Sequence, residues 1–283
     1  MNPVPIPDYS SFFLPAWPWL LMALSTFTFW LHLLMVGVIL GCTIFLCVRR
    51  LRYKTPTDLD RQLDSRILKT MPVSVSLAIT LGIAPLLFIQ VLYGHYFYTA
   101  NIFIAWFWMA SLAFLLLGFV AVYLAKLTWH QRWGVLFILL VPLMFVSIVY
   151  IFTNNAVLAI QPEHWLEFQR GLRHLHVHDA ENYILLPRLF HNIGAALVIS
   201  GLAVAWIGRF RTGVSALDPA QQAEHAARLG LRWLLLGLGW QLIFGTWYLI
   251  SIPTDMLRHL AGFSTPAGVA WMIALLFVVL NLF

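Results

Sequence analysis

The chain has 283 residues, of which 61% are hydrophobic and only 10% are charged. A typical soluble domain is about 45–50% apolar and about 25% charged, so the composition argues against a soluble enzyme, a nucleic-acid module, a disordered chain and a disulfide scaffold. The net charge of +6 does not indicate a nucleic-acid partner, because positive charge in a membrane protein marks its cytoplasmic loops.

Seven apolar segments follow one another along the chain. A membrane-spanning helix needs about 20 mostly apolar residues, and the segments that qualify are residues 18–48, 71–94, 102–125, 133–153, 188–208, 230–251 and 265–283. Residues 163–178 have apolar side chains at near-helical spacing and predict an amphipathic helix on the outer interface. We therefore expect an all-α, polytopic transmembrane bundle of about seven spans, a single integral membrane domain over residues 1–283.

The basic residues predict the orientation of these spans. Residues 49–70, 126–132 and 209–232 hold 13 of the 17 Lys and Arg residues. Because cytoplasmic loops are enriched in Lys and Arg, we expect the N-terminus outside, the C-terminus inside, and a multi-pass location in a bacterial inner membrane.

Two histidines are the ionisable side chains that lie deepest in the apolar segments. His32 precedes Arg49 by 17 residues and His191 precedes Arg209 by 18, which places both imidazoles roughly 26 Å from the basic loops at 1.5 Å per residue. Ionisable groups in a bilayer are costly and mark functional sites by default. All eleven Asp and Glu residues lie outside the spans, which argues against a proton-coupled transporter.

Glycines recur in the same order after both histidines, which indicates a weak parallel duplication. After His32 they are Gly37 and Gly41 on the same span and Gly82 on the next span; after His191 they are Gly194 and Gly201 on the same span and Gly237 and Gly239 on the next. Small residues let helix backbones or a flat ligand approach closely, and a neutral imidazole is an axial ligand of haem iron. The pattern predicts b-type haem at His32 and His191. The alternative is a histidine hydrogen-bonded to a neighbouring helix.

Further residues near the outer boundary fit the same hypothesis. His95 and His259 end the second and sixth spans, so either supplies a candidate second axial ligand to a haem near the rim. Arg188 lies three residues before His191, where it can pair with haem propionates. Interfacial snorkelling is an equally good explanation of this arginine.

The order and spacing of these segments resemble subunit I of the cytochrome bd-type quinol oxidases. In that family the first span carries a haem-ligating histidine in a context like residues 31–34 (LHLL), and the second span ends in a segment similar to residues 88–94 (FIQVLYG). The fifth span opens with a second haem histidine in a context like residues 188–191 (RLFH). The resemblance covers about residues 22–250 and implies a haem-carrying electron-transfer bundle.

The chain also departs from that family. The family's third span carries two glutamates near the oxygen-reducing haem, whereas residues 101–111 contain no acid. The family's long quinol-binding loop after span six is reduced here to roughly a dozen residues, and its later spans have no counterpart. The resemblance therefore implies a subunit that passes electrons between a membrane quinone and an outer partner, without oxygen reduction by this chain itself.

The partner is expected to be a c-type cytochrome or another outer redox subunit, because the chain has neither a CxxCH motif nor iron–sulfur cysteines. For the quinone, the sequence suggests only an outer groove near Tyr96, Trp106 and Trp108. Two other functions stay open. A transporter or channel matches the span count, and a cofactor-free scaffold subunit matches the composition but gives the paired histidines no role.

Overall fold

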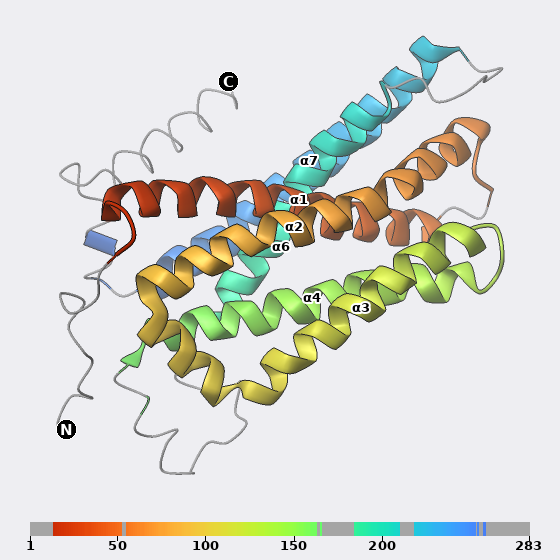
Figure 1. Ribbon diagram of the computed structural model, residues 1–283. Coiled ribbons are helices and arrows are strands. Elements are labelled where there is room, and N and C mark those ends of the chain that lie inside the picture. Colours follow the sequence, from red (N-terminus) through yellow and green to blue (C-terminus); the bar gives the residue numbers. More distant parts are fainter. Residues whose placement is uncertain are drawn as a thin grey trace.

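The computed structural model describes residues 14–52, 55–162, 165, 184–209, 218–252, 254 and 257–258. Across these ranges the structure is helical and contains no strand. The long helices are α1 (Pro18–Arg52), α2 (Asp58–Phe103), α3 (Ala105–Thr128), α4 (Gly134–Ala159), α6 (Leu185–Ile207) and α7 (Pro219–Ser251) (Figure 1). All six are long and apolar enough to cross a membrane, which confirms the all-α class and supports a multi-pass protein in contact with lipid.

Two of the expected elements fall where the structure gives no description. The apolar segment 265–283 lies outside the described residues, and of the interfacial segment 163–178 only Trp165 is described. The indole Nε1–H of Trp165 donates to the carbonyl oxygen of Leu158 at 2.9 Å, which holds this residue against the end of α4.

Helix α2 is longer than the second apolar segment at both ends. Residues 58–70, expected as part of a basic loop, are helical, and the helix continues beyond residue 94 to Phe103, so the next helix begins at Ala105 and not at residue 102. A capping box starts the helix: the Thr57 side chain accepts from the Asp60 N–H, and the Asp60 side chain accepts from the Thr57 N–H. Leu63 and Ile67 of this extension are buried in the core. At its other end α2 bends at Tyr93, whose φ of −132° and ψ of 30° are not helical.

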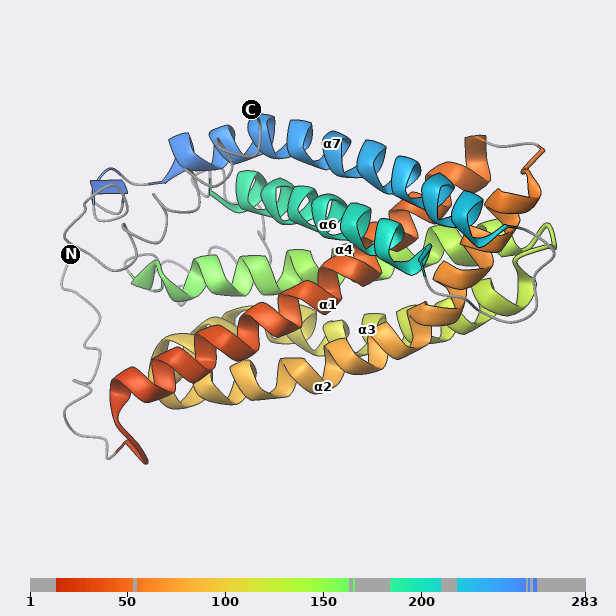
Figure 2. The ribbon, with the colours of Figure 1, turned by 90° about the horizontal axis from the view of Figure 1, so that it is seen from above.

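Helix α1 lies in the middle of the bundle and contacts α2, α4 and α6. Helices α3 and α4 form one pair and α6 and α7 another, each pair running side by side (Figures 1 and 2). Glycines set the closest approaches: a Cβ at Gly41 of α1 would collide with Ala196 and Ser200 of α6. A Cβ at Gly201 of α6 would collide with the backbone of α7 at Gly230. The sequence left open whether these glycines admit a neighbouring helix or a flat ligand. At Gly41 and Gly201 they bring helix backbones together.

A buried ion-pair network joins three helices at the end of the bundle where α1 ends and α2 and α7 begin, which we call the basic end. Arg49 of α1 donates to Asp64 at 2.7 Å and to Asp60 at 2.9 Å, both on α2. His225 of α7 contacts the same Asp60 oxygen at 2.9 Å. Burial alone would raise the pKa of Asp60, but hydrogen bonds from Thr57, Arg49 and His225 outweigh it and hold that pKa well below its usual range.

Candidate functional site

His32 lies on α1 and faces α2. Its ring nitrogen Nδ1 is 2.9 Å from the backbone carbonyl oxygen of Ala78. The ring reaches this carbonyl because the residue four positions on, Gly82, has no side chain: a Cβ there would lie 2.8 Å from both Nδ1 and Cε1 of His32. Residues four apart on a helix share one face, so Ala78 and Gly82 together form the surface that receives the imidazole.

His191 makes the equivalent contact in the second pair of helices. It lies on α6 and faces Gly245 of α7, where a Cβ would be 3.2 Å from the histidine Nδ1. The residue four positions before this glycine is Gln241. Its amide nitrogen donates to Nδ1 of His191 at 2.8 Å when its carbonyl oxygen accepts from the Ala195 N–H at 3.0 Å.

We call these two arrangements the histidine–glycine contacts. Each consists of an imidazole, a glycine on the long helix that follows in the chain (α2 after α1, α7 after α6), and the residue four positions before that glycine. The sequence comparison of the two halves matched Gly82 with Gly237 and Gly239. The structure differs, because Gly237 packs against the backbone of Val198, and no atom of the described residues lies within 4 Å of a Cβ at Gly239. The counterpart of Gly82 is Gly245.

The surroundings of the two imidazoles differ. Aromatic rings crowd His191: Tyr248 lies 5.5 Å from it, centroid to centroid, and the neighbouring Phe190 stacks on Phe244 at 4.9 Å. The indole N–H of Trp240 donates to the Phe190 carbonyl oxygen at 2.8 Å, so α7 is fixed to α6 beside the histidine. His32 instead makes its hydrogen bond among the described residues to the α2 backbone, and both imidazoles are half-buried.

The donor atoms of the two contacts can be tested against the needs of a haem iron. A carbonyl oxygen only accepts, so Nδ1 of His32 carries the proton and Nε2 keeps its lone pair. This is the tautomer of an iron-ligating histidine, whose other nitrogen usually donates to a backbone carbonyl or carboxylate. His191 reaches that tautomer when the Gln241 amide turns over, so that its oxygen accepts from Nδ1 and its NH2 faces the Ala195 N–H without a hydrogen bond. His32 therefore fits as it stands, and His191 fits after an amide rotation that loses the hydrogen bond from Ala195.

The other expected site residues differ in where they lie. His95 lies in α2 two residues past the bend at Tyr93, and eleven residues of helix, about 16 Å, separate that bend from Gly82. His95 is thus not beside His32. Arg188 is half-buried in the first turn of α6, three residues before His191 and on the same helix face. His259 lies outside the described residues.

Three buried polar side chains, one each on α2, α3 and α4, adjoin the same apolar cluster, and we call them the buried polar cluster. The sequence did not single them out as a set. Side-chain atoms of Asn101, Trp108 and Asn155 are buried with no described hydrogen-bond partner. Trp108 packs on the apolar cluster that contains Ala100, Ile104 and Ile151; Asn101 directly follows Ala100, and Asn155 lies one turn after Ile151. Leaving such groups unpaired costs about 1–3 kcal/mol each, so each needs a partner beyond the described residues, such as a water or a ligand.

Comparison with known proteins finds no matching family model, no similar curated protein and no similar solved structure. The two histidine–glycine contacts and the buried polar cluster are therefore the features that bear on function.

Proposed function

We propose that this chain is the haem b-containing membrane subunit of a respiratory electron-transfer complex, with one haem at His32 and one at His191. The observation that carries the proposal is the hydrogen bond between Nδ1 of His32 and the Ala78 carbonyl. It leaves Nε2 as a lone-pair donor on a half-buried imidazole, within an apolar helix that carries no carboxylate. Its counterpart at His191 supports the second haem.

The chain's own residues then have distinct roles. A bound b-type haem supplies reversible one-electron chemistry. Gly82 and Gly245 give each imidazole room to lie against the next helix, and Ala78 and Gln241 orient the ring through Nδ1. Arg188, one turn before His191, is placed to balance propionate charge.

The buried polar cluster supports a quinone as the membrane substrate. A quinone has two carbonyl oxygens that accept hydrogen bonds, and its reduced form has two hydroxyls that donate them. Among the described residues the Trp108 N–H has no acceptor, and the Asn101 and Asn155 side-chain oxygens have no donor, so the cluster offers partners to both redox forms. We propose that the quinone head group lies here. Trp106 is 87% exposed, and we assign it to the lipid-facing side.

The topology belongs to the same proposal. Seven spans, with the N-terminus outside, place the basic end in the cytoplasm and both histidines near the outer face of a bacterial inner membrane. A c-type cytochrome or another outer redox subunit would then exchange electrons with the haems. The resemblance to subunit I of the bd-type oxidases and the two histidine–glycine contacts favour this arrangement and an ancient internal duplication.

A cofactor-free scaffold subunit is the second candidate function. The observation in its favour is that Gly37, Gly41, Gly194 and Gly201 all serve close contacts between α1, α6 and α7. A scaffold would use the same glycines and would bind no haem.

An anaerobic reduction experiment separates the two candidates. The complex is purified from its native membrane in the oxidised form, and a water-soluble quinol is added while the absorption spectrum is recorded. The proposal predicts that quinol produces the reduced b-type haem bands, and that His32→Ala removes part of the signal while His130→Ala, at the basic end, leaves it intact. Absence of haem would favour the scaffold. Haem that dithionite reduces but quinol does not would contradict the quinone assignment.

A further inference from the structure

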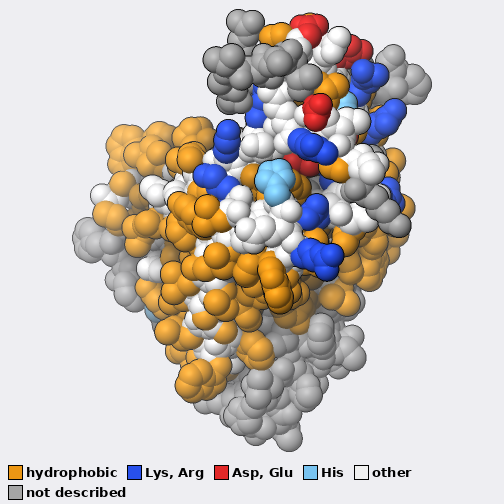
Figure 3. Space-filling model, turned by 90° about the vertical axis from the view of Figure 1, so that its right-hand side faces the viewer, with side chains coloured by type: hydrophobic (Ala, Val, Ile, Leu, Met, Phe, Trp, Pro, Cys, Tyr) orange, Lys and Arg blue, Asp and Glu red, His pale blue; other side chains and the backbone are white. Residues whose placement is uncertain are grey.

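A cleft opens at the basic end, between the end of α1, the start of α2 and the turn that follows α3. It has a volume of about 420 Å³, open to solvent, and its lining includes Arg49, Arg50, Arg61, Asp64, Trp129 and His130. Basic side chains gather on this end of the molecule (Figure 3). The cleft is remote from both histidine–glycine contacts and has no part in the function proposed above.

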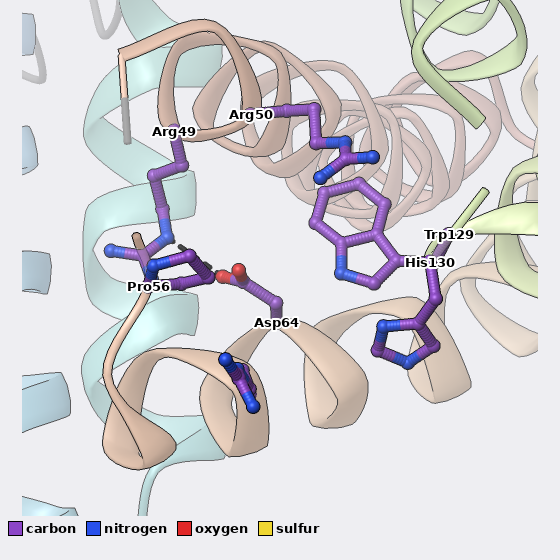
Figure 4. Close-up of a pocket in the computed structure, with 7 residues that line it drawn as sticks. Arg49, Arg50, Pro56, Asp64, Trp129 and His130 are labelled. Carbon is purple, nitrogen blue, oxygen red and sulfur yellow. Dashed lines mark hydrogen bonds and ion pairs between the residues drawn. The ribbon is translucent and has the colours of Figure 1, made fainter. Parts of the chain in front are cut away.

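The acidic groups near the cleft are already engaged. Asp64, which lines it, is held by Arg49 at 2.7 Å (Figure 4), and Asp60 is shared by Arg49 and His225. Arg61 lies 3.8 Å from Asp58, but both side chains are largely exposed, so this pair is weak. The carboxylates that bind Arg49 therefore do not neutralise the other basic groups of the cleft, Arg50, Arg61 and His130.

Arg50 is the basic group whose hydrogen bonds are incomplete. Its guanidinium lies over the Trp129 ring, 5.5 Å from the centroid, and one terminal nitrogen donates to the Gln131 carbonyl oxygen at 3.2 Å. Its Nε–H is buried, and no described residue accepts it. The guanidinium itself lines the cleft, and a guanidinium fixed on an aromatic face can donate its remaining terminal N–H groups to a phosphate or carboxylate oxygen.

The position of the cleft selects the kind of anion. Arg50 comes two residues after the apolar run of α1 ends at Val48, and Trp129 directly follows α3. Large apolar side chains next to these residues in the sequence, Leu51 and Leu127, are 61% and 73% exposed. Aromatic and basic side chains at the end of an apolar helix are typical of the lipid head-group level. The cleft therefore combines anion donors with a position at the ends of two apolar helices, where the exposed Leu51 and Leu127 lie outside its lining.

We propose that this cleft binds a phosphate group, presented by a phospholipid whose acyl chains lie along the exposed apolar side chains at the ends of α1 and α3. The phosphate accepts hydrogen bonds from the terminal nitrogens of Arg50 and from Arg61, and His130 adds a third donor. Trp129 holds the Arg50 guanidinium in place. The bound lipid then links the end of α1 to the turn between α3 and α4.

Native mass spectrometry of the full-length protein tests this assignment. Delipidated protein in mild detergent is titrated with dioleoylphosphatidylglycerol, and the fraction of protein with bound lipid is measured. We expect Arg50→Gln to weaken binding about tenfold, because a charge-assisted hydrogen bond is lost. Arg52→Gln is the matched control: it lies two residues further along α1, is exposed and does not line the cleft, so binding should change less than about twofold.

Two further arms keep the result decisive. Arg61→Gln alters an exposed side chain and should weaken binding about threefold, which provides a test if Arg50→Gln does not fold. A parallel titration with sodium phosphate distinguishes the source: binding of inorganic phosphate that depends on Arg50 and excludes the lipid would retain the phosphate chemistry and overturn the lipid. Equal lipid binding by wild type, Arg50→Gln and Arg61→Gln would overturn the site.

Discussion

His32 and His191 lie against glycines in the same way, but their Nδ1 atoms meet different kinds of partner. Ala78 offers a backbone carbonyl, which only accepts, so the tautomer of His32 is fixed by the main chain. Gln241 offers a side-chain amide, which can donate or accept, so the tautomer of His191 depends on the orientation of one side chain. Two contacts of similar geometry therefore differ in what sets the histidine tautomer: the main chain at His32 and a side-chain amide at His191.

The space at the two glycines also differs. The hypothetical Cβ comes to 2.8 Å from His32 at Gly82 and to 3.2 Å from His191 at Gly245. The first distance requires the ring to move, whereas the second requires a shift of a few tenths of an ångström. The His32 contact is thus tighter and fixed, and the His191 contact is looser and adjustable.

The largest expected effect comes from a substitution that should destabilise both histidine–glycine contacts equally. Asp60→Asn removes the carboxylate that links Arg49 of α1 to His225 of α7, which leaves a buried arginine with weaker compensation. We expect a loss of about 3 kcal/mol in the free energy of unfolding, with both haems lost together on heating. Loss of one haem well before the other would show that the network supports one pair of helices only.

The pKa of Asp60 gives the same network a defined pH dependence. Because the folded-state pKa lies below the unfolded value of about 3.9, the stabilisation is fully present above that value. It is lost as the pH falls through the lower, folded-state pKa. Thermal melts of wild type should fall toward those of Asp60→Asn only at such acid pH. Convergence of the two near neutral pH would contradict the assignment.

The next effect separates the two contacts. Gly82→Ala should displace His32, cost about 2 kcal/mol by overpacking and remove the haem assigned to that site. Gly245→Ala should cost less and retain its haem. Gly239→Ala, where a Cβ meets nothing, is the control and should be neutral or stabilising by up to about 1 kcal/mol. Thermal denaturation with haem quantification measures all three, and equal effects at Gly82 and Gly239 would contradict the contact.

A smaller effect tests whether Trp108 takes part in the proposed quinone site. Trp108→Phe removes a buried N–H for which no described residue is an acceptor, so it should leave stability unchanged or slightly improved. Quinol-driven haem reduction should slow about fivefold, the equivalent of one hydrogen bond of about 1 kcal/mol. The haem spectra should not change, because Trp108 touches neither histidine. Unaltered reduction rates would exclude Trp108 from the quinone site.

The smallest expected effect comes from Gln241, the partner of His191 whose amide can turn over. Gln241→Leu removes the hydrogen bond to Nδ1 of His191, worth about 1 kcal/mol or about 40 mV for a one-electron couple. A potentiometric titration should show one haem component shifted and the other unchanged. A shift of both components, or of neither, would argue against Gln241 as the residue that orients His191.

The sequence predicted the helical class and the positions of six apolar helices, because apolar runs of this length have few alternatives. It did not predict the helical extension over residues 58–70. That extension depends on the Thr57–Asp60 cap and on burial of Leu63 and Ile67. Charge density suggested a loop there, whereas tertiary packing favours a helix.

The sequence could not assign the glycines their partners. Gly37, Gly41 and Gly82 look alike in the chain, yet the first two receive α6 and the third receives an imidazole. Gln241 carried a usable signal, because a polar side chain inside an apolar span marks a functional position. Its partner His191 is 50 residues away, and only the packing of α6 on α7 brings them together.

The most direct test of the central claim is the number of haems per polypeptide, measured by pyridine haemochrome against protein concentration. The protein is isolated from a haem-replete native membrane as wild type, His32→Ala and His191→Ala. Ligation at both histidine–glycine contacts predicts two b-type haems in wild type and one in each variant. Wild type without haem, or a count that His32→Ala leaves unchanged, would contradict it.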